Sequence, residues 1–210
     1  SWLAGWGTAA LLARSVAPKK QVLVALLIHV GLLLAFPTRF NFIVGQLNMV
    51  VALLVTLMIT SSTIKTKIGG TILLILIKSN YAMLLFLFVK QWRQLVAAVA
   101  MVALTIVLTL PLIKREWYVS FWQQRVQAMV VSAPTTTDVD YYNQSLRATM
   151  ARLQWNDAYQ LTALLFLGCG LILTIYYRDP MLAVLVSLVL SPIVWQHYVV
   201  VTYPILILVG

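Results

Sequence analysis

Four short groups of polar residues interrupt a chain that is otherwise dominated by apolar side chains. They are residues 45–48 (Gly-Gln-Leu-Asn), 78–80 (Lys-Ser-Asn), 143–147 (Asn-Gln-Ser-Leu-Arg) and 191–198 (Ser-Pro-Ile-Val-Trp-Gln-His-Tyr). An ammonium group is a compact cation with three donors, and an imidazole can bind phosphate or move a proton near neutral pH. Lys78 and His197 supply these two groups. The pattern therefore favours a site for a phosphate-bearing ligand.

Each polar group also has an ordinary structural interpretation. Gln46 and Asn48 stand where an apolar segment begins, and such side chains commonly cap a helix. Lys78 could direct its ammonium to a carbonyl oxygen or to the membrane surface, instead of to a phosphate. Asn and Ser are frequent in turns, and Trp195 is a natural anchor at a membrane interface. A strongly polar residue at membrane depth is nevertheless costly, and it indicates a functional site by default.

The composition indicates that the apolar segments around these polar groups are helices surrounded by lipid. Hydrophobic residues make up 62% of the 210 residues and charged residues 10%, whereas soluble domains carry about 25% charged residues. The 15 basic residues outnumber the 5 acidic ones, and many lie in short clusters between apolar runs. That placement is typical of cytoplasmic loops, so we interpret the charge of +10 as a membrane signal and exclude nucleic acid as a partner.

The apolar runs predict the helices that must position the polar groups. A span needs about 20 apolar residues. The predicted spans are residues 21–36, 47–64, 95–113 and 160–177, with 3–13 as the tail of a further span. Both ends of the chain start or stop inside apolar sequence, so we expect a fragment of a longer membrane protein. His29, in the middle of 21–36, is predicted to be a hydrogen-bonded histidine that faces the bundle.

Two apolar segments, 68–89 and 181–209, carry polar residues in the middle. Basic clusters flank the first of them on both sides, which predicts that it enters and leaves the membrane on the cytoplasmic face. Two half-helices with Lys78 at the tip would satisfy this, and a single crossing with Lys78 facing the bundle is the alternative. The second segment is predicted to take the same shape, with residues 191–197 at its tip. Residues 114–159 then form an extracytoplasmic loop with an aromatic amphipathic stretch around Trp117.

In this order, the four groups resemble motifs of glycosyltransferase family 87, a polytopic family related to mannosyl- and arabinofuranosyltransferases. Residues 45–48 resemble the family's GQxN segment, and Lys78 resembles its lysine after a short apolar helix. Residues 143–145 match an NQS motif, and 191–198 are close to an SPxxWxHY segment. Trp92-Arg93 resembles the basic end of the following helix.

The resemblance implies an all-α, polytopic transmembrane bundle with the C-type glycosyltransferase fold, forming one module over residues 1–210. It implies transfer of a hexose or pentose from a polyprenyl-phosphate-linked donor to a glycolipid or polysaccharide acceptor. The reaction would take place on the outer face of a bacterial plasma membrane, without a metal or another cofactor. The implied substrate- and phosphate-binding residues are Gln46, Asn48, Lys78, Asn143, Gln144, Ser145, Arg147, Trp195 and His197.

The chain departs from the family pattern in its carboxylates. Inverting transfer needs a general base, usually a carboxylate, and the superfamily places it in the first outer loop. None of the five acidic residues stands there, so we expect the base upstream of Ser1. Asp138 and Asp140 lie in the predicted outer loop and are weaker candidates. Broken half-helices are also characteristic of secondary transporters, so a transporter or a lipid-linked sugar flippase is the alternative function.

Overall fold

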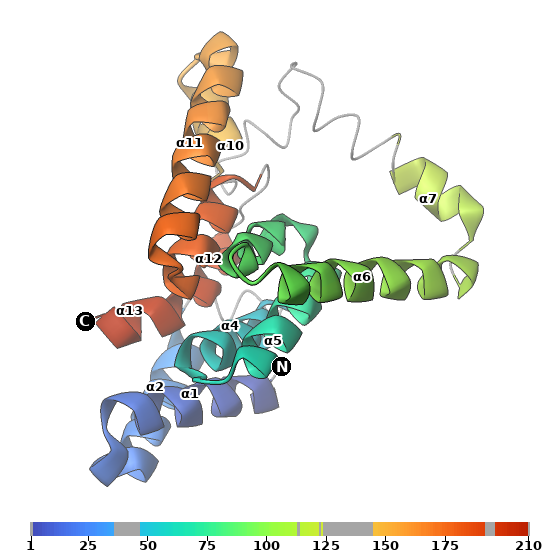
Figure 1. The fold of residues 1–210 in the computed structure, drawn as a ribbon. Helices are drawn as coiled ribbons and strands as arrows, with labels where there is room; N and C mark the ends of the chain where they lie inside the picture. Colours follow the sequence, from blue (N-terminus) through green and yellow to red (C-terminus); the bar gives the residue numbers. More distant parts are fainter. Residues whose placement is uncertain are drawn as a thin grey trace.

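A computed structural model shows an assembly of helices of very different lengths (Figure 1). The structure describes residues 2–35, 47–112, 114–121, 123, 145–191 and 196–209. Every regular element in these ranges is a helix, as the sequence predicts.

The N-terminal half contains two helical hairpins, two helices of the 3₁₀ type and one long helix. In chain order they are α1 (Trp2–Val16), η1 (Pro18–Lys20), α2 (Gln21–Leu34), α4 (Asn48–Thr60), α5 (Ile64–Ile77), η2 (Ser79–Phe88) and α6 (Trp92–Thr109). The first hairpin is α1 with α2, and the second is α4 with α5, joined by only three residues.

The C-terminal half consists of a second long helix and several short ones. In chain order, the elements after α6 are η3 (Leu110–Leu112), α7 (Arg115–Phe121), α10 (Leu146–Arg152), α11 (Asn156–Tyr177), α12 (Pro180–Val189), η5 (Gln196–Thr202) and α13 (Tyr203–Val209). Asp179 begins α12 as an N-cap, since its carboxylate accepts the Met181 N–H at 2.8 Å. Pro180 follows at the first helical position, where the missing N–H costs nothing.

Helix α4 lies at the centre of the apolar core. It contacts α1, α5, α12, η5 and α13. Its buried side chains include Met49, Val55 and Met58, and they pack with Leu74 of α5 and Val184 of α12. Because η5 and α12 come from the last 30 residues described, this core joins the two ends of the chain.

Two helices are long and apolar enough to cross a membrane by length and composition, within the part of the chain that the structure describes. They cover Trp92–Leu112 and Ala158–Tyr177. Figure 1 shows α6 leading away from the core toward α7, and Ala98 is its one buried residue. A helix that is apolar all round and exposed along its length is suited to lipid. These helices confirm the apolar segments predicted at 95–113 and 160–177.

Several predicted boundaries are wrong. The segment predicted at 47–64 ends at Thr60, and the basic pair Lys65 and Lys67 lies in the first turn of α5 instead of a loop. At 1.5 Å per residue, the 13 residues of α4 reach about 20 Å, which is short of the ~30 Å of a bilayer core. Helices α7 and α10 and the first residues of α11 lie within residues 114–159, so the segment predicted as an extracytoplasmic loop contains helices. Its position outside the membrane stays a prediction.

His29 is buried as predicted, with 2% of its surface exposed, but the hydrogen bonds are missing. Among the described residues, neither of its ring nitrogens has a hydrogen-bond partner. The imidazole instead stacks on Trp6, with ring centroids 4.2 Å apart, and meets the edge of Trp2 at 5.4 Å. A Cβ on Gly5 would lie 3.3 Å from the imidazole Cε1, so the glycine leaves space for the His29 ring between the helices. Aromatic packing, not a polar partner, therefore holds this histidine.

Candidate functional site

Lys78 stands where the apolar segment of residues 68–89 breaks. Helix α5 ends at Ile77, and Lys78 takes an extended conformation with φ −147° and ψ 107° before η2 begins at Ser79. Its N–H donates to the Leu74 carbonyl at 2.8 Å, and its carbonyl accepts from the Tyr81 N–H at 3.1 Å. Both backbone groups of Lys78 are thus satisfied, which lowers the cost of interrupting the helix at this residue.

The Lys78 side chain is held by two residues that are distant in the sequence. Its Nζ donates a hydrogen bond to Oδ1 of Asn48, which is fully buried at the start of α4. The same Nζ lies 3.3 Å from the centroid of the Tyr198 ring, on η5. A cation over an aromatic face is attracted by the negative face of the ring. We name these three residues, Asn48, Lys78 and Tyr198, the lysine cluster.

The lysine cluster concentrates positive charge. The N–H groups in the first turn of a helix have no partner within that helix, and they give the terminus a partial positive charge. The ammonium of Lys78 lies beside Asn48, the first residue of α4, so both charges meet at one place. An ammonium carries three donors, and Asn48 takes one of them. The arrangement is therefore suited to an anion that approaches the start of α4.

The structure excludes one of the sequence-based interpretations. Asn48 was a candidate helix cap, but the N-cap of α4 is Leu47, which makes no side-chain cap bond, and Asn48 is the first residue within the helix. The amide oxygen of Asn48 instead accepts from Lys78. The capping interpretation of Asn48 is therefore wrong.

Ser145 and Arg147 belong to a different pair of helices, α10 and α11. Ser145 is the N-cap of α10, and its Oγ accepts the Ala148 N–H at 3.1 Å. Arg147 is 7% exposed, and its guanidinium carbon lies 5.8 Å from the centroid of the Tyr159 ring on α11. Arginine stacks well on aromatic faces, so this contact holds a buried cation at the α10–α11 junction.

Replacement of Ser145 by alanine is expected to destabilise the protein by about 1 kcal/mol, because the cap of α10 is lost. The effect should appear as a lower melting temperature of the purified protein. Ser145→Thr should keep most of the stability, since a threonine hydroxyl also caps a helix and adds no charge at this buried position. A loss of the same size for both variants would contradict the capping role.

The remaining predicted site residues lie outside the described residues, in whole or in part. Gln46, Asn143, Gln144 and Trp195 are outside them, as are Asp138 and Asp140. The backbone of His197 lies in η5, but its side chain is outside the described part. The predicted convergence of all four polar groups on one cavity stays a prediction.

One member of the lysine cluster was missed as a site residue by the sequence reasoning. Tyr198 closes the 191–198 motif, but it was not among the residues implied to bind the substrate. Its position beside His197 in that motif was the available signal. Tyr81 lies next to the cluster in the sequence, is buried in the first turn of η2, and donates its backbone N–H to the Lys78 carbonyl.

The described residues contain no group of three His, Cys, Asp or Glu side chains close enough to hold a metal ion. Comparison with known proteins gave one result. The family model described as Glycosyltransferase family 87 matches residues 1–200. Neither the search of curated proteins nor the search of solved structures gave a match. Because the match covers nearly the whole sequence, the chain belongs to glycosyltransferase family 87, a family of membrane glycosyltransferases.

Proposed function

We propose that this glycosyltransferase moves a hexose or pentose from a polyprenyl-phosphate-linked donor to a glycolipid or polysaccharide acceptor. In this proposal, the lysine cluster binds the donor phosphate at the extracytoplasmic side of a bacterial plasma membrane. The observation that carries the proposal is the meeting of the Lys78 ammonium with the start of α4. Both features favour an anion, and a lipid-linked phosphate is the anion that a membrane transferase must hold.

The reaction assigns a definite task to Lys78. The acceptor oxygen attacks the anomeric carbon, the bond from that carbon to the phosphate oxygen breaks, and the bonding electrons leave with the polyprenyl phosphate. The acceptor proton passes to a general base, for which a carboxylate is the usual group. Negative charge grows on the phosphate as the bond breaks, so a fixed ammonium stabilises the transition state more than the bound donor.

The partners of Lys78 suit this task. Asn48 and Tyr198 hold the ammonium from two sides, so its position is fixed before the donor arrives. Fixed groups lose little freedom when the ligand binds, which is the physical basis of preorganisation. Both partners are uncharged at neutral pH, so they leave the positive charge of Lys78 available to the phosphate.

A reconstituted reaction tests the proposal. The full-length protein is placed in vesicles with a polyprenyl-phospho-sugar and an acceptor, and the glycosidic product is followed over time. Formation of product that depends on the lipid-linked donor is the expected result. Movement of the labelled lipid across the vesicle membrane without product would overturn the proposal in favour of a flippase. The breaks after Ile77 and after Val189 are the features that such a transporter would share.

A further inference from the structure

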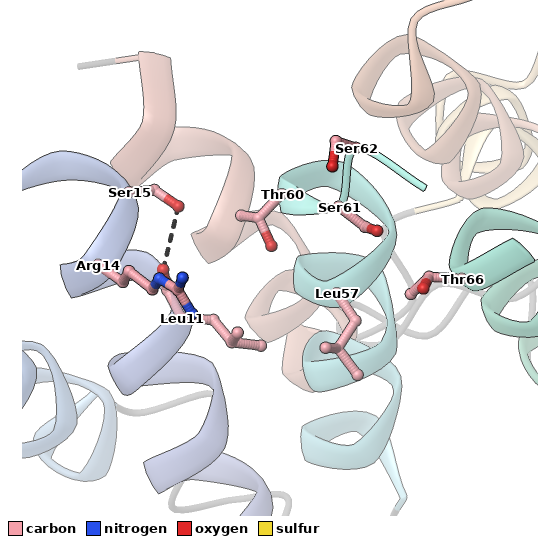
Figure 2. A pocket seen from close by; sticks show the side chains of 8 residues that line it. All are labelled: Leu11, Arg14, Ser15, Leu57, Thr60, Ser61, Ser62 and Thr66. Atoms are coloured by element: carbon pink, nitrogen blue, oxygen red, sulfur yellow. Dashed lines mark hydrogen bonds between the residues drawn. The ribbon is translucent and has the colours of Figure 1, made fainter. Parts of the chain in front are cut away.

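A second polar site lies at the other end of the α4–α5 hairpin. A pocket of about 460 Å³ opens between the last turns of α1 and the turn that joins α4 to α5 (Figure 2). Its lining combines one arginine with five hydroxyl side chains and two leucines: Arg14, Ser15, Thr60, Ser61, Ser62, Thr66, Leu11 and Leu57. Figure 2 shows Arg14 and Ser15 on α1 facing the end of α4 across the pocket.

This pocket is separate from the lysine cluster. Asn48 begins α4 and Thr60 ends it. At 1.5 Å per residue, the two residues lie about 18 Å apart along the helix. Lys78 follows the last turn of α5, and Thr66 lies in the first turn. A ligand in the pocket would therefore not touch the lysine cluster, and the two sites can be tested separately.

The positive charge at this end of the bundle is not neutralised by any acidic residue nearby in the sequence. The first 115 residues contain no Asp and no Glu. Lys19 and Lys20 follow Arg14 after a short connection, and Lys65 and Lys67 lie in the first turn of α5 beside Thr66. Arg14 lines the pocket, and four lysines stand within five residues of lining residues in the sequence, so an external anion is the natural counter-charge.

Ser15 and Thr60 donate to the carbonyls of Leu11 and Thr56 at 3.0 and 2.8 Å, which leaves Ser61, Ser62 and Thr66 as the lining hydroxyl donors beside this charge. Ser61 and Thr63 share a hydrogen bond at 3.2 Å, and Thr63 and Thr66 share another at 2.7 Å. Hydroxyl protons rotate to suit a new acceptor, so these bonds can be redirected to a ligand oxygen. Thr63 is the N-cap of α5 but makes no side-chain cap bond, so the N–H groups of the first turn also face outward here.

We propose that this pocket binds a phosphate group, carried by the headgroup of an anionic phospholipid. The Arg14 guanidinium pairs with the phosphate oxygens in a bidentate manner, and the hydroxyls of Ser61, Ser62 and Thr66 donate to the remaining oxygens. Leu11 and Leu57 provide an apolar wall for the glycerol backbone of the lipid. The high density of cations at this end matches the leaflet in which anionic lipids attract basic residues.

The test measures the melting temperature of the full-length protein in a zwitterionic detergent during titration with short-chain lipids. Phosphatidylglycerol is expected to raise the melting temperature with a saturable dependence, and phosphatidylcholine is expected to do so much less. Arg14→Gln should raise the apparent Kd for phosphatidylglycerol at least about tenfold, which corresponds to about 1.4 kcal/mol. Thr66→Ala should weaken binding in the same direction by a smaller factor.

Arg93→Gln is the matched control. Arg93 is an exposed arginine in the first turn of α6 and does not line the pocket, so its loss should leave the Kd unchanged. A third titration with inorganic phosphate identifies the source of the anion. Arg14-dependent protection by phosphate alone would assign the pocket to a free ion and overturn the lipid assignment. An equal response of the wild type and Arg14→Gln, or no response to phosphatidylglycerol, would overturn the site itself.

Discussion

Replacement of Lys78 by methionine is expected to lower kcat/KM for the lipid-linked donor between about 10-fold and 100-fold. A hydrogen bond from a charged donor contributes about 1.5–3 kcal/mol, and each 1.4 kcal/mol changes a rate constant about tenfold. The loss should fall mainly on kcat, because the ammonium is most useful when the departing phosphate gains charge. Steady-state kinetics with the reconstituted protein measure both parameters.

The choice of methionine separates chemistry from folding. Its side chain is unbranched like that of lysine and fills the same space without a charge, so the core around α4 can remain packed. Lys78→Arg keeps the charge and should retain part of the activity, although its planar group fits Asn48 and Tyr198 differently. Lys90→Met, in an exposed lysine after η2, is the matched control and should behave as the wild type. Full activity of the Lys78→Met variant would contradict the role of Lys78 in binding the donor phosphate.

Replacement of Gly170 by alanine is expected to destabilise the protein by about 1–3 kcal/mol, the usual cost of overpacking. Gly170 lies on α11 where this helix meets α12. A Cβ at this position would come within 2.4 Å of Cγ1 and 3.1 Å of Cγ2 of Val186. Val186 lies in α12, and a β-branched side chain has one strongly preferred rotamer in a helix, so the clash pushes the two helices apart. In a chain of this size, each kcal/mol lowers the melting temperature by roughly 2–4 °C.

The same helix offers the control for this prediction. Gly168 has open space at its Cβ position, so Gly168→Ala should be neutral or slightly stabilising, because alanine favours a helix more than glycine does. The double variant Gly170→Ala with Val186→Ala should recover much of the lost stability, since the clashing methyl groups are removed. Equal melting temperatures for the two single glycine variants would contradict the close packing of α11 on α12.

The breaks in the helices could be predicted from the sequence because single residues determine them. Lys78 interrupts an apolar run, and the break falls at this residue in the structure. The run 181–209 is interrupted in the same way, since α12 ends at Val189 and η5 begins at Gln196. The long helices α6 and α11 were also predictable, because an uninterrupted apolar run of about 20 residues is most often a helix that can cross a membrane.

The lysine cluster could not be predicted in full because its contacts depend on packing between distant segments. Asn48 precedes Lys78 by 30 residues, and Tyr198 follows it by 120, so no local pattern sets their distance. The sequence identified Asn48 and Lys78 as polar residues in apolar segments, where burial of a polar group is costly. It did not show that the Lys78 ammonium donates a hydrogen bond to Asn48. For His29, the prediction of a hydrogen bond was wrong for the same reason. The residue type suggested a polar partner, whereas Trp2 and Trp6 pack against the imidazole in the described structure.

The long separation between Lys78 and Tyr198 sets an order of events during synthesis. Asn48 and Lys78 can pair as soon as α4 and α5 have left the ribosome and entered the membrane. Tyr198 is added about 120 residues later, which at about 5–20 residues per second means a delay of roughly 6–24 s. During this interval, the ammonium lacks its aromatic cover. The proposed phosphate site is therefore completed only after η5 has been synthesised, when the helices from α1 to α12 have already been made.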